Sequence, residues 1–302
     1  MRWDDFRRSD NVEDDRGGGG FGGGGGIGIP VGGGGLGIGT VIVLGLIGWA
    51  LGIDPSVLIG GAELVNSGTH YQQPSQPNAR RTGAPKDQMG DFVAAVLGNT
   101  EDTWSEIFKN GGQQYSVPRL RLFSGSEQGG CGFAQAAMGP FYCPGDQRVY
   151  LDLSFFDELA TRFRSPGNFP QAYVIAHEVG HHVQNLLGIT GKVDQMRERM
   201  SKRDANAMSV RVELQADCFA GVWAYHANKE HGGTASIGEK DVEQAVAAAT
   251  AIGDDRLQRQ AQGRVVPDSF THGTSEQRVR WLNKGLKSGD IKTCDTFRAQ
   301  QL

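Results

Sequence analysis

The sequence predicts an α+β protein in which a mostly helical domain with a small sheet follows one transmembrane helix. Three observations support this prediction. An uncharged apolar stretch lies in the first fifth of the 302 residues, several long segments carry hydrophobic residues at helical spacing, and one short segment alternates apolar and polar residues. Helices that outnumber strands without a repeating strand–helix order are typical of the α+β class.

Glycine is concentrated near the start of the chain. Sixteen of the 46 glycines fall between Gly17 and Gly39, and the rest of the chain has an ordinary glycine content. Ten of the first 16 residues are charged. We therefore expect 1–16 to be a disordered charged head and 17–35 to be a flexible glycine-rich tether.

The apolar stretch Leu36–Ile53 has 18 residues and no charge. At about 1.5 Å per residue it just crosses a hydrocarbon core of about 30 Å, and Trp49 suits the interface. A buried core helix or a secretory signal is the alternative, but polar positions at helical spacing and a small-residue cleavage site are both missing from the stretch. We predict a single transmembrane helix at 36–56.

Basic residues give this predicted span an orientation. Four arginines precede it, and the next basic residues are Arg80, Arg81 and Lys86. This bias favours a cytoplasmic N-terminus, so we expect a single-pass protein of the inner membrane with its main domain in the periplasm. The polar, proline-containing segment 66–90 is predicted to be a linker, and 91–302 has the size of one domain.

Charge and cysteine content exclude two classes of protein. The net charge is −4, so no basic field would attract nucleic acid. The four cysteines are too few for a small disulfide scaffold and form no paired CxxC zinc framework. Cys131 could pair with Cys143 and Cys218 with Cys294 in an oxidising compartment, but three connectivities are possible and free buried thiols are the alternative.

Hydrophobic periodicity outlines the main domain. Helices are expected over about 91–108 (with a possible break at Gly98–Asn99), 169–187, 204–229 and 240–262, and after Thr274–Ser275, where Thr274 and Gln277 fit a capping box. A strand is expected at Gln147–Phe155. The strand around Tyr150 is either an edge that could hold an extended peptide or a plain core strand.

The expected helix at 169–187 contains His177-Glu178-Val179-Gly180-His181. Histidines at i and i+4 lie on one face of a helix, so His177 and His181 could bind one zinc ion. Glu178 is placed to take a proton from a water held there. Because so short a motif also occurs by chance, a third ligand is needed to exclude two unrelated surface histidines.

The next expected helix offers that ligand in Val-Glu213-Leu-Gln-Ala-Asp217. Glu213 and Asp217 share a face, and their neighbours are apolar, where isolated carboxylates are costly. A solvated acidic face is therefore a poorer explanation than metal binding. Glu213 would complete a His–His–Glu zinc site with an open fourth position, and Asp217 would accept the ring N–H of a ligand histidine.

Further candidates lie outside these two helices or beside the motif. His272, in a turn before the last helix, could hydrogen-bond an oxyanion, or it could simply be a turn histidine. Arg278 or Arg280 could orient the site. His182 is rotated off the face of His181 and is expected to be a structural or rim histidine rather than a ligand.

Several longer blocks carry a family resemblance: HEVGHH, ELQADCFAG, GPFYCP with VYLDLSFF, and THGTSEQRVRW. With these blocks, the chain resembles the bacterial membrane-anchored neutral zinc metallopeptidase family of YpfJ-like proteins, and more distantly the thermolysin-type gluzincins. The resemblance implies a zincin-like fold, bound Zn2+, zinc ligands His177, His181 and Glu213, and Glu178 as the general base. It also implies Asp217 as the acid behind a ligand histidine and, less closely matched, His272 as the residue that stabilises the transition state.

The resulting expectation is a membrane-anchored zinc-dependent endopeptidase that acts on a peptide or protein substrate. Two alternatives stay open. One is a catalytically silent, zinc-stabilised, membrane-tethered binding or assembly module, against which Glu178 argues because a structural zinc site needs no base and normally has no open position. The other is a zinc hydrolase that acts on a different amide, for example in the cell envelope.

Overall fold

The structure is a computed structural model that describes residues 1–16, 85, 87–135, 139–229, 237, 239–255, 257–258 and 265–302. Its main sheet has the strand order β1–β2–β6–β5, formed by Val12–Asp14, Arg119–Phe123, Arg148–Asp152 and Phe141–Cys143. The pairs β1–β2 and β2–β6 are parallel and β5–β6 is antiparallel. A separate antiparallel hairpin joins β3 (Ser126–Gly129) to β4 (Gly132–Gln135).

The two faces of the sheet have different coverings. Leu120 is opposite Val149 and Leu122 is opposite Leu151, and all four side chains belong to the main hydrophobic core with residues of the helices. The residues between them point the other way, where Phe123, Tyr150 and Cys143 form a small second cluster. This alternation is the strand pattern that the sequence predicts around Tyr150.

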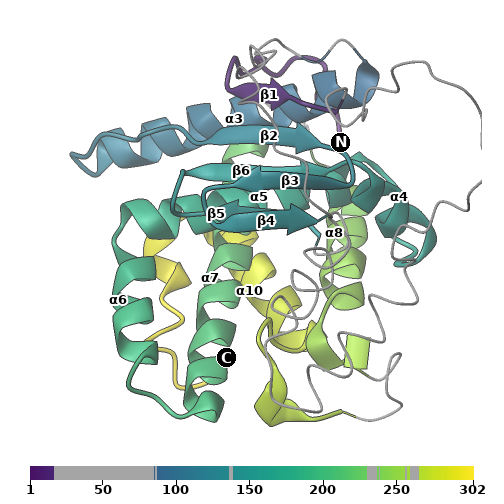
Figure 1. Cartoon of the computed structure of the whole chain (residues 1–302). Helices are drawn as coiled ribbons and strands as arrows, with labels where there is room; N and C mark the ends of the chain where they lie inside the picture. The colour runs from purple at the N-terminus through teal and green to yellow at the C-terminus, as the bar shows by residue number, and fades with distance from the viewer. Residues whose placement is uncertain are drawn as a thin grey trace, which may run out of the picture. The chain divides into compact units, whose positions relative to one another are not determined.

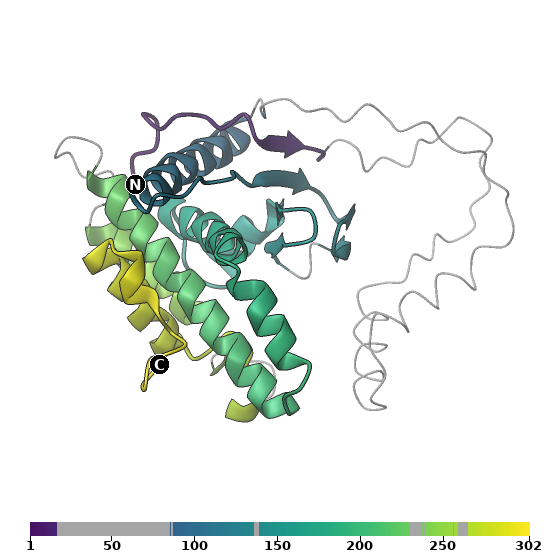
Figure 2. The same cartoon turned by 90° about the vertical axis from the view of Figure 1, so that its left-hand side faces the viewer.

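Helices α6, α7, α8 and α10 lie below the sheet in Figure 1, whereas α3 lies at the level of β1 and β2, and α7 and α10 run side by side in both views (Figures 1 and 2). Gly221 and Gly285 allow this contact: a Cβ atom at Gly285 would lie 1.9 Å from the Cys218 carbonyl oxygen, and one at Gly221 would lie 2.2 Å from the Leu282 carbonyl oxygen. The helices are α3 (Gln88–Asn110), α4 (Ser154–Thr161), α5 (Asn168–Leu186), α6 (Ile189–Arg197), α7 (Lys202–Lys229), α8 (Glu239–Ala251) and α10 (Ser275–Ser288), with short 3-10 turns η2 (Pro267–Ser269) and η3 (Ile291–Cys294).

The prediction of a disordered head at 1–16 is wrong. Trp3, Phe6 and Val12 are buried in the main core, and Val12–Asp14 forms β1 at the edge of the sheet. The charges of this segment meet opposite charges of the domain, as in the pair between Arg8 and Asp91 at 2.8 Å. The prediction was wrong because it rested on the number of charged residues in the segment alone. It did not include the opposite charges of the domain that pair with them.

Gly98 explains how the head is held. The sequence suggests a helix break near this glycine, but α3 continues through it. A Cβ atom at Gly98 would lie 2.2 Å from the Arg7 carbonyl oxygen, and the Ser9 amide donates to the Ala94 carbonyl at 2.9 Å. Glycine is therefore required here for close backbone approach, a packing role that a sequence pattern does not distinguish from a break.

The predicted transmembrane helix, and the membrane localisation that depends on it, are not borne out among the described residues. Within the part of the chain that the structure describes, there is no helix with the length and apolar character needed to cross a bilayer. The predicted segments 17–35, 36–56 and most of 66–90 themselves lie outside the described residues. The α+β class and the small sheet are as predicted, and the compact unit of the main domain also takes in the first residues, Met1–Gly19, together with Arg80–Leu302.

Two smaller questions from the sequence are answered. The strand around Tyr150 is β6, which pairs on both sides, so it is a core strand and β5 is the edge beside it. The cysteines pair as Cys131–Cys143 and Cys218–Cys294. The first pair ties β5 to the end of the β3–β4 hairpin, and the second ties α7 to η3.

Candidate metal centre

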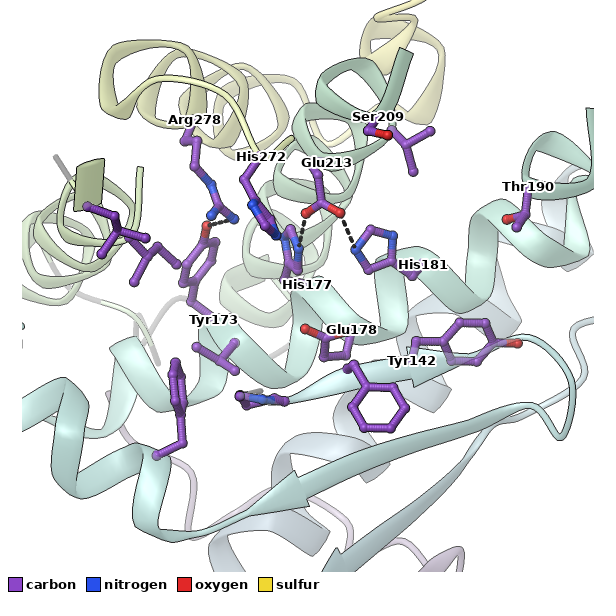
Figure 3. Close-up of a pocket in the computed structure, with 18 of the residues that line it drawn as sticks. Tyr142, Tyr173, His177, Glu178, His181, Thr190, Ser209, Glu213, His272 and Arg278 are labelled. Carbon is purple, nitrogen blue, oxygen red and sulfur yellow. Dashed lines mark hydrogen bonds and ion pairs between the residues drawn. The ribbon is translucent and has the colours of Figure 1, made fainter. Parts of the chain in front are cut away.

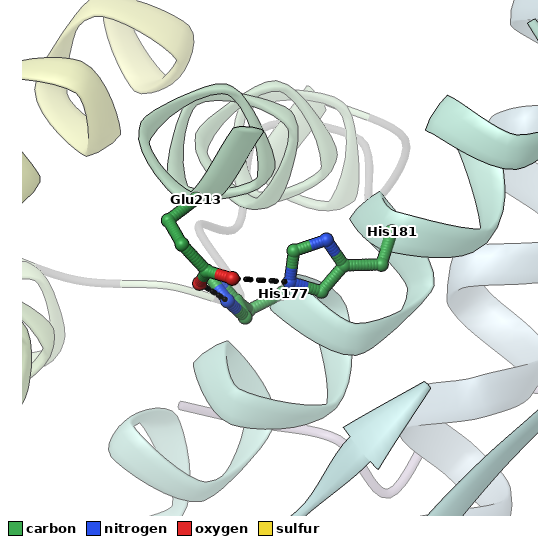
Figure 4. Close-up of side chains that lie close together, drawn as sticks. All are labelled: His177, His181 and Glu213. Atoms are coloured by element: carbon green, nitrogen blue, oxygen red, sulfur yellow. Dashed lines mark hydrogen bonds and ion pairs between the residues drawn. The ribbon is translucent and has the colours of Figure 1, made fainter. Parts of the chain in front are cut away.

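Helix α5 presents two histidines to helix α7 (Figure 4). His177 and His181 are one turn apart, with ring centroids 4.8 Å apart and planes almost perpendicular at 89°. The helix has Phe169-Pro170 in its first turn, where proline needs no amide partner, and Gly188 follows its end with φ 69°.

Glu213 on α7 completes the cluster. Its carboxylate oxygens lie 3.2 Å from the Nε2 atom of His177 and 3.5 Å from the Nε2 atom of His181. The three potential ligand atoms are all within 4.8 Å of one another. The structure thus brings together the three residues that the sequence predicts as ligands, although His177 and Glu213 are 36 residues apart in the chain.

Gly180 within the motif lets the two helices come close enough. A Cβ atom there would lie 3.0 Å from the Ala216 carbonyl oxygen and 3.2 Å from the Ala216 Cα atom. These separations are tighter than ordinary side-chain contacts, so a larger residue at position 180 would push α7 away. The glycine therefore helps to set the distance between Glu213 and the two imidazoles.

Asp217 lies behind His177 in a fully buried polar network. Its Oδ1 atom is 2.9 Å from His177 Nδ1 and accepts a hydrogen bond from the Tyr173 hydroxyl at 2.5 Å. Arg278 donates to both carboxylate oxygens at 2.9 Å. When the imidazole is neutral, an ionised Asp217 keeps the His177 proton on Nδ1, so that the Nε2 lone pair on the side of Glu213 is the one available to a metal ion.

The Nδ1 atom of His181 also has a hydrogen-bond partner, which is an amide rather than a carboxylate. Its Nδ1 atom lies 2.9 Å from Gln184 Oε1, and the Gln184 amide nitrogen donates to the Val212 carbonyl at 2.7 Å and to Gln215 Oε1 at 3.0 Å. Because the amide nitrogen is used in this way, the Gln184 oxygen faces His181 and accepts its Nδ1–H. In their neutral forms both imidazoles therefore present Nε2 lone pairs on the same side.

The electrostatic field at this cluster favours positive charge. Burial alone would lower the pKa of His177, but the charge of Asp217 and the hydrogen bond to it raise that pKa to about 10. Burial likewise opposes the charge of Asp217, yet Arg278 and His177 hold its pKa at about 2. Burial also opposes ionisation of Glu213, and the two histidines bring the pKa of Glu213 well below its ordinary value.

The cluster forms part of the wall of a cavity of about 670 Å³. Glu178 also lines this cavity and lies between the two imidazoles and the strand that carries Tyr142 (Figure 3). The Glu178 side chain is nearly buried, at 7% exposure. The expected base, the ligand cluster and a cavity next to both are therefore present at one place.

His272 points into the same cavity (Figure 3). Its loop is held by Asp254, whose Oδ2 atom accepts hydrogen bonds from the backbone amides of Thr271, His272 and Gly273 at 2.8, 2.6 and 3.0 Å. The His272 Nδ1 atom lies 3.3 Å from Asp254 Oδ1, and this hydrogen bond raises the pKa of His272. Asp254 thereby orients the imidazole with Nε2 available to the cavity.

Other expected residues lie elsewhere. Arg280 is on the exposed side of α10 and pairs with Glu276 at 2.6 Å, so of the two arginines only Arg278 reaches the site. Tyr173 and Gln184 were missed by sequence reasoning, although each lies within four residues of a ligand histidine on the same helix. Asp254 carried no sequence signal, because its partner lies 18 residues away and in a loop.

The residues present fit a zinc ion. Two imidazole nitrogens, each oriented by a hydrogen-bonded partner, and one carboxylate oxygen, with a cavity on one side, form the donor set of catalytic zinc sites. A structural zinc site would normally supply a fourth protein ligand. Among the described residues, His177, His181 and Glu213 are the group of histidine, cysteine and acidic side chains that could hold a metal ion.

A helix with the HExxH pattern and a glutamate from the following long helix define the class of zinc metallopeptidases. The family model described as "Putative neutral zinc metallopeptidase" matches residues 1–297, and the chain belongs to this family.

The chain has relatives in two groups of bacteria. It is 47% identical over 298 residues to the uncharacterized protein YpfJ of Escherichia coli K12, which covers 98% of this chain and 99% of YpfJ. It is 41% identical over 260 residues to the uncharacterized protein Rv2575 of Mycobacterium tuberculosis H37Rv, which covers 83% of this chain and 85% of that protein. No solved structure matches the chain.

Proposed function

We propose that this protein is a zinc-dependent peptidase that hydrolyses peptide bonds with an activated water. The observation that carries the proposal is the cluster of His177, His181 and Glu213, with ligand atoms within 4.8 Å of one another, in the wall of a cavity that Glu178 also lines. Membership of the zinc metallopeptidase family supports the same chemistry.

The cluster would hold the metal through the Nε2 atoms of His177 and His181 and the carboxylate of Glu213. A zinc ion in such a site lowers the pKa of a water molecule and polarises a substrate carbonyl. Asp217 and Gln184 keep the two imidazoles in the tautomer that leaves Nε2 free. Arg278 keeps Asp217 ionised and thereby helps to orient His177, although it bonds to Asp217 and not to the His177 ring itself.

Glu178 is the proton carrier in this proposal. It accepts a proton from the attacking water and delivers it to the nitrogen of the departing amine, so that the carboxylate is regenerated. Its near burial beside the cluster suits this role, since few competing waters reach it. His272, held by Asp254, donates a hydrogen bond from Nε2 to the negative charge that develops on the carbonyl oxygen.

The edge strand β5 supports a peptide as the substrate. Phe141 and Tyr142 of this strand line the cavity, and β5 pairs with β6 on one side. Backbone groups on the other side of such an edge can hold an extended polypeptide by strand addition. In this proposal the peptide backbone lies along the cavity wall beside Glu178.

The first experiment measures hydrolysis of fluorescent unfolded casein by the zinc-loaded protein, with and without a chelator. We expect cleavage that stops on chelation and returns when zinc is added. Glu178→Gln should keep stoichiometric zinc and lose activity by about 10²- to 10⁴-fold, because the proton carrier is removed while the ligands remain.

The same assay separates peptidase from binding protein. His272→Ala should retain zinc and lower the turnover number by about 10²- to 10³-fold. Zinc binding without turnover of casein or of a broad peptide library would instead favour a zinc-stabilised binding protein. Turnover that persists unchanged in Glu178→Gln would exclude the proposed mechanism.

A further inference from the structure

His182, the residue directly after the ligand His181, faces away from the metal cluster and is completely buried. Its Nε2 atom lies 2.6 Å from the carbonyl oxygen of Ser116, and its Nδ1 atom lies 3.0 Å from the hydroxyl of Tyr142. The ring also makes edge contacts with the rings of Tyr115 and Tyr142, at centroid distances of 5.7 and 5.3 Å. One imidazole on α5 therefore joins the segment before β2 to the edge strand β5.

The direction of each hydrogen bond follows from the chemistry of the groups. A carbonyl oxygen only accepts, so His182 must donate from Nε2 to Ser116, and the neutral ring then has an acceptor at Nδ1. The Tyr142 hydroxyl donates its proton to that nitrogen. The hydroxyl oxygen in turn accepts from the Asn185 amide nitrogen at 3.1 Å. Burial lowers the pKa of His182, which agrees with a neutral imidazole in these roles.

Tyr142 connects this arrangement to the cavity. Its ring lines the cavity, while its hydroxyl is directed away from His177 and Glu213 (Figure 3). Within the described part of the chain, the hydrogen bonds of this hydroxyl go to the far side of α5, to His182 and Asn185. The aromatic face toward the cavity is held in place from behind by the same helix that carries two of the metal ligands.

We propose that His182 is a positioning residue for substrate binding, which acts through Tyr142 to hold the edge strand β5 at a fixed distance from the metal ligands on α5. The proposal rests on the peptidase function proposed above, and it adds which residue sets the cavity wall along which an extended peptide lies. His182 touches neither metal nor substrate. Its effect should fall on the affinity for peptide rather than on zinc binding.

Paired substitutions at His182 separate the two bonds of its ring. The amide nitrogen of glutamine can replace Nε2 and keep the bond to Ser116, but it leaves Tyr142 without an acceptor. The side-chain oxygen of asparagine can replace Nδ1 and keep the acceptor for Tyr142. If His182 acts through Tyr142, His182→Asn should preserve peptide binding better than His182→Gln. A general packing role predicts no such order.

Peptide affinity is measured in the zinc-loaded Glu178→Gln background, with a fluorescein-labelled unfolded casein peptide and fluorescence anisotropy. We expect Tyr142→Phe and His182→Gln each to raise Kd by about threefold to tenfold, the effect of one lost hydrogen bond, with zinc content unchanged. The double variant should be no weaker than His182→Gln alone. His226→Gln, the same substitution at a histidine whose Nε2 atom also bonds a backbone carbonyl (that of Gly289, at 2.9 Å), is the matched control and should leave Kd unchanged.

Amide hydrogen exchange of Phe141–Cys143 in the free protein gives a second readout that does not depend on activity. Faster exchange in Tyr142→Phe and His182→Gln, and near-normal exchange in His182→Asn, is expected. Unchanged exchange and Kd in Tyr142→Phe would overturn the inference, as would equal losses for the two His182 variants. Absence of casein hydrolysis by the wild type would instead count against the proposed function, while exchange still decides whether His182 holds β5.

Discussion

Single residues around the cluster form a chain of paired charges that runs from Arg278 through Asp217 to His177. Arg278 is 3% exposed and Asp217 is fully buried, so each would be costly without the other. The bidentate pair also leaves an Asp217 lone pair for His177, at 2.9 Å. The orientation of one ligand histidine is thus determined by residues on α7 and α10 that do not touch the metal position.

Asp217→Asn tests this chain. We expect zinc affinity to fall by about 10- to 100-fold, because the His177 ring loses its charged partner. The unfolding free energy of the metal-free protein should also fall by about 3–5 kcal/mol, because Arg278 stays buried without a counter-charge. Chelator competition and urea unfolding measure the two effects. Asp204→Asn, an exposed residue of the same helix, is the control, and equal losses in both variants would contradict the assignment.

Among the elements, the first strand differs most from the sequence prediction, because its segment was expected to be disordered. Residues 1–16 supply the edge strand β1, two aromatic core residues and a set of arginines that pair with α3. Trp3 packs edge-on against Phe92 of α3 at 5.4 Å, and the Arg8 guanidinium lies over the Trp3 ring at 5.3 Å. This segment is therefore part of the folded domain and stabilises it through both burial and pairing.

Gly98→Ala should displace this segment from α3. The added methyl group would meet the Arg7 carbonyl oxygen at 2.2 Å, and neither backbone can move without breaking hydrogen bonds. We expect a lower melting temperature and rapid proteolysis within 1–16. Gly191→Ala on α6 is the matched control, since its Cβ atom would meet nothing within 4 Å and should stabilise its helix by about 0.5–1 kcal/mol. Intact docking in Gly98→Ala would show that this contact is unimportant.

Acid should loosen the same element through Glu13 of β1. Burial opposes ionisation of this carboxylate, but Arg148, Arg119 and Arg121 lower its pKa. Since the folded pKa is depressed, the stabilisation is present above the unfolded value of about 4.3 and is lost as pH falls through the folded value.

The corresponding measurement is the unfolding free energy of wild type and Glu13→Gln from pH 6 down to pH 2.5. The difference between the two proteins should be largest at pH 6 and shrink below about pH 4. Glu276→Gln, at an exposed site on α10, should show no comparable change. If the difference in unfolding free energy between wild type and Glu13→Gln grew on acidification, this explanation would be wrong.

In the molecule as a whole, each of the two disulfides links two parts of the chain that are neighbours in the folded domain. Cys218, next to Asp217, is joined to Cys294 across a separation of 76 residues, whereas Cys131 and Cys143 are separated by 12. The longer loop restricts the unfolded chain more strongly. It also ties the helix that carries Glu213 to the C-terminal part of the domain.

Removing each disulfide in turn should show this difference. In the loop-entropy description, Cys218→Ser with Cys294→Ser should lower the unfolding free energy by about 4.5 kcal/mol, and Cys131→Ser with Cys143→Ser by about 3 kcal/mol. Guanidinium unfolding under oxidising conditions measures both. A larger loss from the shorter loop would mean that native contacts, rather than loop closure, dominate the stabilisation.

Sequence patterns predicted the features that depend on local spacing. Histidines four residues apart on a helix must share a face, and Glu213 and Asp217 must share another, whatever the rest of the chain does. The alternation around Tyr150 and the capping box at Thr274 are equally local, and the structure contains both. These patterns also placed the helices α5 and α7 within a few residues of their observed ends.

Features that depend on distant partners were decided only by the tertiary structure. Local patterns do not show hydrogen bonds between residues far apart in the chain. Three such bonds shape the site: Arg278 to Asp217, the His272 backbone to Asp254, and His182 to Tyr142, over 61, 18 and 40 residues. The docked head is the clearest case, because charge density predicts disorder only when no folded surface supplies counter-charges. Local spacing thus determined which side chains share a helix face, and long-range packing determined what each of those faces meets.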